Sequence, residues 1–146
     1  MNKVTQSIYK NAVDNSLFDS NGNPRFIIGN GNPENISGVS IVSSKWCLNG
    51  RNLMFEINGS FSSKVDAYKN ICTFVIPQWI SDKIQTEIQN LVDITRCELV
   101  LITGSVSPLY FIIYKNDNNI VFNLGVQIPQ SDSTRYFKLR YNIIIE

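Results

Sequence analysis

The sequence contains no histidine, which removes most of the common ways to build a catalytic centre. Without histidine the chain cannot form a Ser-His or Cys-His nucleophile system, and it lacks the commonest ligand of zinc and non-haem iron. Charged residues are only 17% of the 146 residues, and the net charge is +1 with no basic stripe. A nucleic-acid partner is therefore not expected. We predict a protein that is not an enzyme, without catalytic residues, cofactor or bound metal.

Long apolar runs are also missing from the chain. No run approaches the roughly 18 apolar residues that a transmembrane helix needs, so membrane insertion is not expected. The first sixteen residues, MNKVTQSIYKNAVDNS, lack the apolar central region of a secretion signal. We therefore expect a protein that is made in the cytoplasm without a signal peptide and released, if at all, by lysis.

Cysteine is scarce, and its number is odd. Cys47, Cys72 and Cys97 lie in or beside apolar runs, and their flanking residues share no pattern. An odd number of cysteines in apolar surroundings argues against a disulfide framework. Buried, reduced thiols are the expected state.

The strongest pattern that the sequence does contain is an alternation of apolar and polar residues. In the stretch 135–145 the polar side carries Lys138, Arg140 and Asn142. The apolar side carries Phe137, Leu139, Tyr141, Ile143 and Ile145. Strict alternation of this length predicts a strand with one face on a core and the other in water.

Further strands of this quality precede it, with polar turns between them. The Asn49-Gly50 pair between the runs 39–48 and 51–61 is a strong hairpin signal, because both residues tolerate a positive φ. Other predicted strands are 71–76, 94–103, 109–114 and 120–124. About seven short strands predict an all-β fold, an antiparallel β-sandwich of jelly-roll type. At 81–93 the apolar residues recur at helical spacing, so a short helix competes there with a covering loop.

Two regions differ in composition. Residues 1–35 are polar and rich in Asn, Gly, Asp and Pro, which favours an N-terminal arm with one short strand at 25–28. A loosely packed terminus is the alternative. Residues 36–146 carry the strand pattern and are expected to form the β-sandwich domain.

From Trp46 onward, five stretches follow one another in a recognisable order. They are EINGSF, TFVIP with its terminal proline, CELVLITG, the hairpin LYFIIYKNDNNIVFNLG and the final strand RYFKLRYNIII. This order, over about two thirds of the chain, resembles the small jelly-roll domains of bacteriophage tail-fibre tips, baseplate receptor-binding proteins and related virion appendages. The resemblance implies a non-enzymatic β-sandwich, often trimeric, on the outside of a phage particle. Those proteins carry a shaft or coiled coil, whereas this chain has no heptads, which suits an accessory protein on a preformed shell or baseplate.

Candidate contact residues come from the aromatic and apolar positions. Trp79 follows Pro77 in a connection and is a candidate for stacking on a glycan, although a plug over one end of the sandwich is an equal alternative. Trp46 and Tyr141 lie in strands, where core packing is expected. The apolar runs 99–102 and 109–114 carry more apolar surface than one core needs, which predicts a subunit interface. Its candidate residues are Leu99, Leu101, Tyr110 and Ile112.

The acidic residues show no catalytic or metal-binding spacing. Asp66, Asp93 and Glu98 are expected to be solvated surface charges, because no signature marks a facing carboxylate pair. Asp117 lies in the run 116–119, which lacks the spacing of a calcium loop and is expected to be a hairpin turn.

Three functional hypotheses follow. The first is a structural component on the exterior of a bacteriophage virion, a capsid-decorating or accessory β-sandwich that docks on capsid or tail proteins through its N-terminal arm. The second is a receptor-binding tail-fibre or baseplate tip that recognises host surface polysaccharide. The third is a glycan hydrolase that uses two carboxylates. In each of the first two, a homo-oligomer is expected, and the resemblance favours a trimer.

Overall fold

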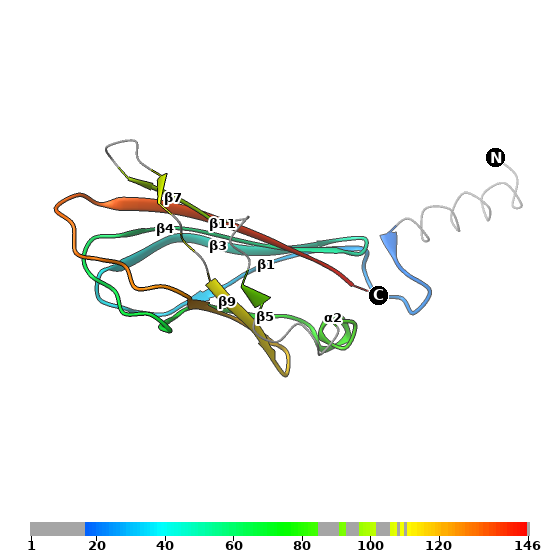
Figure 1. Cartoon of the computed structure of the whole chain (residues 1–146). Coiled ribbons are helices and arrows are strands. Elements are labelled where there is room, and N and C mark those ends of the chain that lie inside the picture. The colour runs from blue at the N-terminus through cyan, green and yellow to red at the C-terminus, as the bar shows by residue number, and fades with distance from the viewer. Residues whose placement is uncertain are drawn as a thin grey trace, which may run out of the picture.

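The protein is an antiparallel sandwich of two β-sheets, which Figure 1 shows as two layers. The computed structural model describes residues 17–84, 91–92, 97–101, 106–107, 109 and 111–145. One sheet has the order β1 (Phe26–Asn30), β3 (Val39–Asn49), β4 (Asn52–Phe61), β11 (Arg135–Ile144), β7 (Cys97–Leu101) and β8 (Val106–Ser107). The other has the order β2 (Asn32–Pro33), β5 (Asn70–Val75), β10 (Asn119–Leu124), β9 (Phe111–Asn116) and β6 (Leu91–Val92). The predicted all-β antiparallel sandwich is confirmed.

The hairpin of β3 and β4 forms the middle of the six-stranded sheet. Its turn has Gly50 at a φ of 64°, the left-handed conformation for which glycine is suited. The register places Trp46 opposite Phe55, and both side chains point to the inner face. The four apolar side chains on the core face of β4, Leu53, Phe55, Ile57 and Phe61, are all completely buried.

Strand β11 lies on the other side of β4, between β4 and β7. The two strands pair from Arg135 opposite Phe61 to Ile144 opposite Asn52. The burial of β11 alternates without a break, and every predicted inward residue is at most 5% exposed. Alternation therefore predicted both the strand and its orientation, since successive side chains point to opposite faces.

Aromatic rings from both sheets meet in the core. Phe55 of the six-stranded sheet lies with its ring centroid 5.0 Å from that of Phe74 and 5.6 Å from that of Phe122. The Phe74 and Phe122 centroids are 5.3 Å apart, at an interplanar angle of 69°. Edge-to-face packing of this kind adds about 0.5–1.5 kcal/mol per pair beyond burial of area. This cluster holds the two layers together.

Strands β1 and β2 both come from the stretch 1–35, for which the sequence predicts an arm. The short strand expected at 25–28 is present as β1, which pairs with β3 from Phe26 opposite Asn49 to Asn30 opposite Lys45. Strand β2 then crosses to the other sheet and pairs with β5. This part of the stretch therefore adds an edge strand to each sheet. The assignment of residues 1–35 to a separate arm stays a prediction.

The one short helix of the described chain, α2 (Gln78–Ser81), begins directly after Pro77. It lies just before the interval 81–93, where the sequence left a helix and a covering loop as alternatives. Within that interval Leu91 and Val92 form β6, and residues 85–90 and 93 lie outside the described residues. No helix of the described residues is long and apolar enough to cross a membrane.

The strand directions give the sandwich two distinct ends, visible in Figure 1. At one end, which we call the loop end, lie residues 34–38, 62–69 and 125–134. At the opposite end, which we call the terminal end, lie the β3–β4 turn, α2 and the C-terminus.

Candidate functional site

The outer face of the six-stranded sheet carries a group of apolar side chains near the terminal end. Register places Ile28 beside Cys47, and Cys47 beside Met54, on the face turned away from the core. One row further along, Phe26 lies in β1 and Ile144 in β11, with Asn49 and Asn52 between them. We call Phe26, Ile28, Cys47, Met54 and Ile144 the outer-face patch.

The patch is open to solvent in the single chain. Phe26 is 61% exposed, Ile28 69% and Ile144 65%, while Cys47 and Met54 are half-buried between their neighbours. A hollow of about 400 Å³ lies along the inner border of the patch, and its lining includes Ile28, Cys47 and Met54 as well as Lys45 and Glu56. Single exposed apolar residues are ordinary on protein surfaces, but a contiguous group across four strands is typical of an interaction surface.

A row of charges borders the patch toward the middle of the sheet. Lys45, Glu56 and Arg140 lie side by side across β3, β4 and β11. The Arg140 Nε donates to Glu56 Oε2 at 3.0 Å, and Asn58 Nδ2 donates to Glu56 Oε1 at 3.1 Å. Partial burial works against ionisation of Glu56, but these hydrogen bonds and the nearby Lys138 and Arg140 charges bring its pKa below the usual value.

This arrangement can bind a protein surface, and it offers no assembled catalytic group. The charges of the bordering row are of both signs and are already paired in part, so they tolerate close approach of another mixed surface. Within the described ranges no group of three or more His, Cys, Asp or Glu residues gathers where a metal ion could bind.

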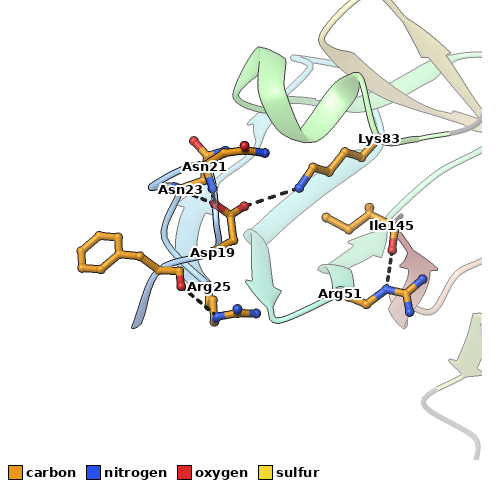
Figure 2. Close-up of polar contacts among 8 residues, drawn as sticks. Asp19, Asn21, Asn23, Arg25, Arg51, Lys83 and Ile145 are labelled. Atoms are coloured by element: carbon orange, nitrogen blue, oxygen red, sulfur yellow. Dashed lines mark hydrogen bonds and ion pairs between the residues drawn. The ribbon is translucent and has the colours of Figure 1, made fainter. Parts of the chain in front are cut away.

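Trp79, the predicted glycan contact, lies at the terminal end on α2. Its side chain is half-buried and packs against the core, and Lys83 Nζ lies 5.4 Å from the centroid of its ring. Figure 2 shows the same lysine reaching Asp19, with 3.5 Å between Lys83 Nζ and Asp19 Oδ2. The ammonium group thus occupies a position near the ring that a stacked sugar would need. The geometry favours the plug, and the glycan contact stays a prediction.

Asp19 organises the chain segment that contacts Lys83. Its Oδ1 accepts hydrogen bonds from the backbone N–H groups of Asn21 and Asn23, each at 2.9 Å (Figure 2). The hydrogen bond from Asn23 is the largest cause that holds the pKa of the Asp19 carboxyl below its usual value. Desolvation is the next largest effect and acts in the opposite direction. Arg25 Nε also donates to the Phe18 carbonyl at 3.1 Å. The segment before β1 is therefore attached to the terminal end through Lys83.

The residues predicted for a subunit interface are only partly described. Ile112 is half-buried in β9, on the outer side of the five-stranded sheet. The backbone of β7 places Leu99 opposite Phe137 and Leu101 opposite Arg135. Tyr110 lies outside the described residues. The interface through these four residues stays a prediction.

The predicted burial of two aromatic residues and two cysteines can be compared with the structure. Trp46 and Tyr141 are each 5% exposed, so their assignment to the core is confirmed. Cys72 is a buried free thiol as expected, but Cys47 is only half-buried, because its position in β3 points to the outer face. The buried state predicted for Cys47 is therefore wrong.

The acidic residues that can be compared agree with the expectation of surface charge. Asp66 Oδ1 lies 3.9 Å from Lys64 Nζ, with both side chains largely exposed. Asp117 has a φ of 57° in the turn between β9 and β10, which confirms the hairpin. Glu98 lies in β7, where only the backbone is described, and Asp93 lies outside the described residues.

The sequence predicts a short strand at 25–28, but it does not identify Phe26 and Ile28 as surface residues, because an isolated short strand does not reveal which of its faces is covered. The alternation in the run FIIGN is too short to distinguish a paired strand from a loop. Ile144 carried a clear signal, since it lies on the polar side of an alternating strand yet is apolar.

Comparison with known proteins gives distant structural likeness only. No protein-family model and no curated protein matches the sequence. The bovine atadenovirus type 4 fibre head aligns over 73% of this chain and 96% of its own, at 13% identity and a TM-score of 0.37.

Two reovirus structures align more extensively with this chain. The C-terminal receptor-binding domain of avian reovirus fibre sigmaC covers 82% of this chain and 74% of its own, at 11% identity and a TM-score of 0.45. A reovirus attachment protein sigma1, in complex with alpha-2,3-sialyllactose, covers 88% and 73%, at 9% identity and a TM-score of 0.38. All three are fibre or attachment proteins of viruses. The three TM-scores all lie below 0.5.

Proposed function

We propose that this chain is a non-enzymatic structural module on the exterior of a virion, and that copies of it associate through the outer-face patch. The observation that carries the association is the exposure of Phe26, Ile28 and Ile144 on one sheet face. Removing an apolar side chain of this size from water contributes about 1.5–3 kcal/mol. Several such side chains together can offset part of the entropy lost on association.

A second copy of the chain is the partner that suits the patch best. The net charge is +1, so copies do not repel one another strongly. The bordering row contains Lys45, Glu56 and Arg140, and a surface with both signs can oppose its own copy without placing like charges together throughout. A trimer is favoured by the resemblance to virion appendages.

The virion location also comes from that resemblance, as does the bacteriophage origin. In the decorating function, the N-terminal arm would attach the sandwich to a capsid shell or tail appendage. Since β1 and β2 pair with the sheets, the attaching part would be the chain before Phe26. Deletion of residues 1–24 should then abolish incorporation into particles while the sandwich remains folded.

The association is tested by light scattering coupled to size exclusion. The full chain should run at a multiple of its 16.6 kDa mass. Ile28→Lys combined with Ile144→Lys should give a folded monomer, because each introduces a charge into the contact. Val42→Lys is the matched control, since Val42 is 79% exposed on the same sheet but lies outside the patch.

A wild-type monomer at high protein concentration would contradict the proposal, as would a doubly substituted protein that still associates. A Val42→Lys variant that becomes monomeric would move the contact away from the patch.

Recognition of host surface glycan is the second candidate function. One observation favours it, an exposed tyrosine that the loop end holds in an unfavourable backbone conformation. The glycan hydrolase has no such observation in its favour.

A further inference from the structure

Tyr68 has an unusual backbone conformation for a bulky residue, and its side chain is exposed. Its φ is 67°, in the left-handed region, and its side chain is 71% exposed. For a bulky residue the left-handed conformation is a true outlier, and such strain concentrates at ligand-binding positions. A side chain this exposed gains little from packing, so the core does not account for the choice of tyrosine.

Backbone hydrogen bonds hold this conformation from the neighbouring strand β10. The Tyr68 N–H donates to the Leu124 carbonyl at 2.7 Å, and the Leu124 N–H donates to the Lys69 carbonyl at 2.8 Å. The loop is fixed again at Val65, which exchanges backbone hydrogen bonds with Ile128 at 3.0 and 2.8 Å. The tyrosine is therefore presented by a preorganised loop, which lowers the entropy cost of binding a ligand.

The same loop forms one wall of a cavity of about 370 Å³ at the loop end. The lining residues, which we call the loop pocket, are Asn35, Ile36, Ser37, Lys64, Val65, Asp66 and Lys69. Val65 is buried and Ile36 half-buried, which gives the pocket an apolar part. Its other members offer amide, hydroxyl, carboxylate and ammonium groups.

The two walls of the loop pocket are locked together at Gly38. This glycine has a φ of 84°, and a β-carbon there would collide with Ser63 Oγ. The Ser62 N–H donates to the Gly38 carbonyl at 2.9 Å. The close approach of the two loops therefore depends on glycine at this position.

The charge of the loop pocket is positive. Lys64 pairs with Asp66 at 3.9 Å, which leaves Lys69 as a cation without an ion pair to any described residue. Tyr68 directly precedes Lys69 in the chain, but it is not among the residues that line the cavity. A ligand that pairs with Lys69 would therefore have to extend beyond the cavity to reach the tyrosine ring.

We propose that the loop pocket binds a saccharide that bears a carboxylate. Lys69 pairs with the carboxylate, Asn35 and Ser37 bond the hydroxyls of the sugar in the pocket, and the part of the saccharide that extends beyond the pocket stacks on the exposed Tyr68 ring. This inference rests on the second candidate function, glycan recognition. The loop pocket lies at the opposite end from Trp79 and apart from the outer-face patch, so association and binding are separable.

The test is an amide NMR titration of the full chain with three probes. They are sialyllactose, a glucuronic-acid oligosaccharide and neutral lactose. An acidic saccharide should shift the amides of 35–38 and 64–69, and lactose should bind roughly tenfold more weakly or not at all. Lys69→Met should remove this preference for the acidic probe.

Tyr68→Asn separates binding from folding. Asparagine tolerates the left-handed region, so the variant should melt at or above the wild-type temperature while binding falls roughly tenfold. Tyr68→Phe keeps the ring and should keep the affinity. Trp79→Ala, at the other end, should bind as the wild type does.

Each contrary result overturns the inference in a different way. No shift with either acidic probe removes the loop pocket as an acidic-saccharide site. Binding that survives Tyr68→Asn but is lost in Trp79→Ala keeps glycan recognition and places it at Trp79. Light scattering on the same samples measures the association of copies independently. A failure of the proposed association can therefore be distinguished from a failure of saccharide binding at the loop pocket.

Discussion

The indole ring of Trp46 lies directly against the backbone of Gly29, its partner across the β1–β3 pair. A β-carbon built at Gly29 would come within 2.8 Å of three atoms of the ring. The tryptophan thus reaches a core exposure of only 5% because the edge strand has no side chain at this point. The contact ties β1 to the sheet and supports the exposed residues Phe26 and Ile28 on its other face.

Gly29→Ala should therefore destabilise the protein. The added methyl group cannot be accommodated without displacing the Trp46 ring, and overpacking of this kind costs about 1–3 kcal/mol. Urea unfolding followed by tryptophan fluorescence measures the change. Asn30→Ala is the matched control, since Asn30 is exposed on the same strand, and its effect should be within about 0.5 kcal/mol. Equal effects of the two substitutions would show that the ring moves freely.

Arg135→Met should loosen the loop end. Arg135 is 3% exposed and donates to the carbonyls of Pro129 and Ser63, so it joins the loop 125–134 to the loop 62–69. Burial lowers the pKa of its guanidinium, which nevertheless remains charged. Losing hydrogen bonds from a charged donor should cost about 1.5–3 kcal/mol.

Urea unfolding and amide hydrogen exchange measure these effects, and exchange should accelerate at 62–69. Arg140→Met is the control, because Arg140 lies on the surface with its side chain 59% exposed and pairs with Glu56. It should cost about 0.2–1 kcal/mol and leave exchange in that loop unchanged. Unaltered exchange in Arg135→Met would mean that the two loops hold together without the guanidinium.

Stability should fall in alkali because of Cys72. Burial raises the pKa of its thiol from the usual 9.0 to about 11, against weaker opposing hydrogen bonds from Ser44 and Asn32. Between these values the unfolded state loses the thiol proton while the folded state keeps it. The stability from the neutral thiol is thus complete below pH 9.0 and is lost as the pH rises toward 11.

Urea unfolding across this pH range measures how steeply the free energy of unfolding falls with pH. Cys72→Ala should flatten this slope, whereas Cys47→Ala should not, because Cys47 is only half-buried on the outer face. Identical slopes in all three proteins would show that other groups account for the alkaline loss.

Alternation predicted much of the fold, and it did so best where one face of a strand is buried. In β4 and β11 the main apolar series, such as Leu53, Phe55 and Ile57, faces the core, whereas Met54 and Ile144 lie on the outer face. The turns at Gly50 and Asp117 were equally predictable, because their positive φ values favour the residue types found there. These signals are local, so a single sequence suffices to read them.

The outer-face patch and the conformation of Tyr68 could not be predicted in this way. Phe26 and Ile28 became surface residues because β1 pairs with β3, a contact between segments that no local pattern specifies. In the sequence, Tyr68 is one of several aromatic residues with nothing to distinguish it. Its left-handed backbone conformation and its hydrogen bond to Leu124 are visible only in the folded structure.

The amino-acid sequence by itself determined that the chain forms short strands with one apolar face, since side-chain alternation is a property of each segment alone. Only the tertiary structure decided which strands became edges, which cysteine was buried and which aromatic residue stayed exposed. Those outcomes depend on pairing between distant segments, where many registers satisfy the same alternation and the packing of the whole core selects one.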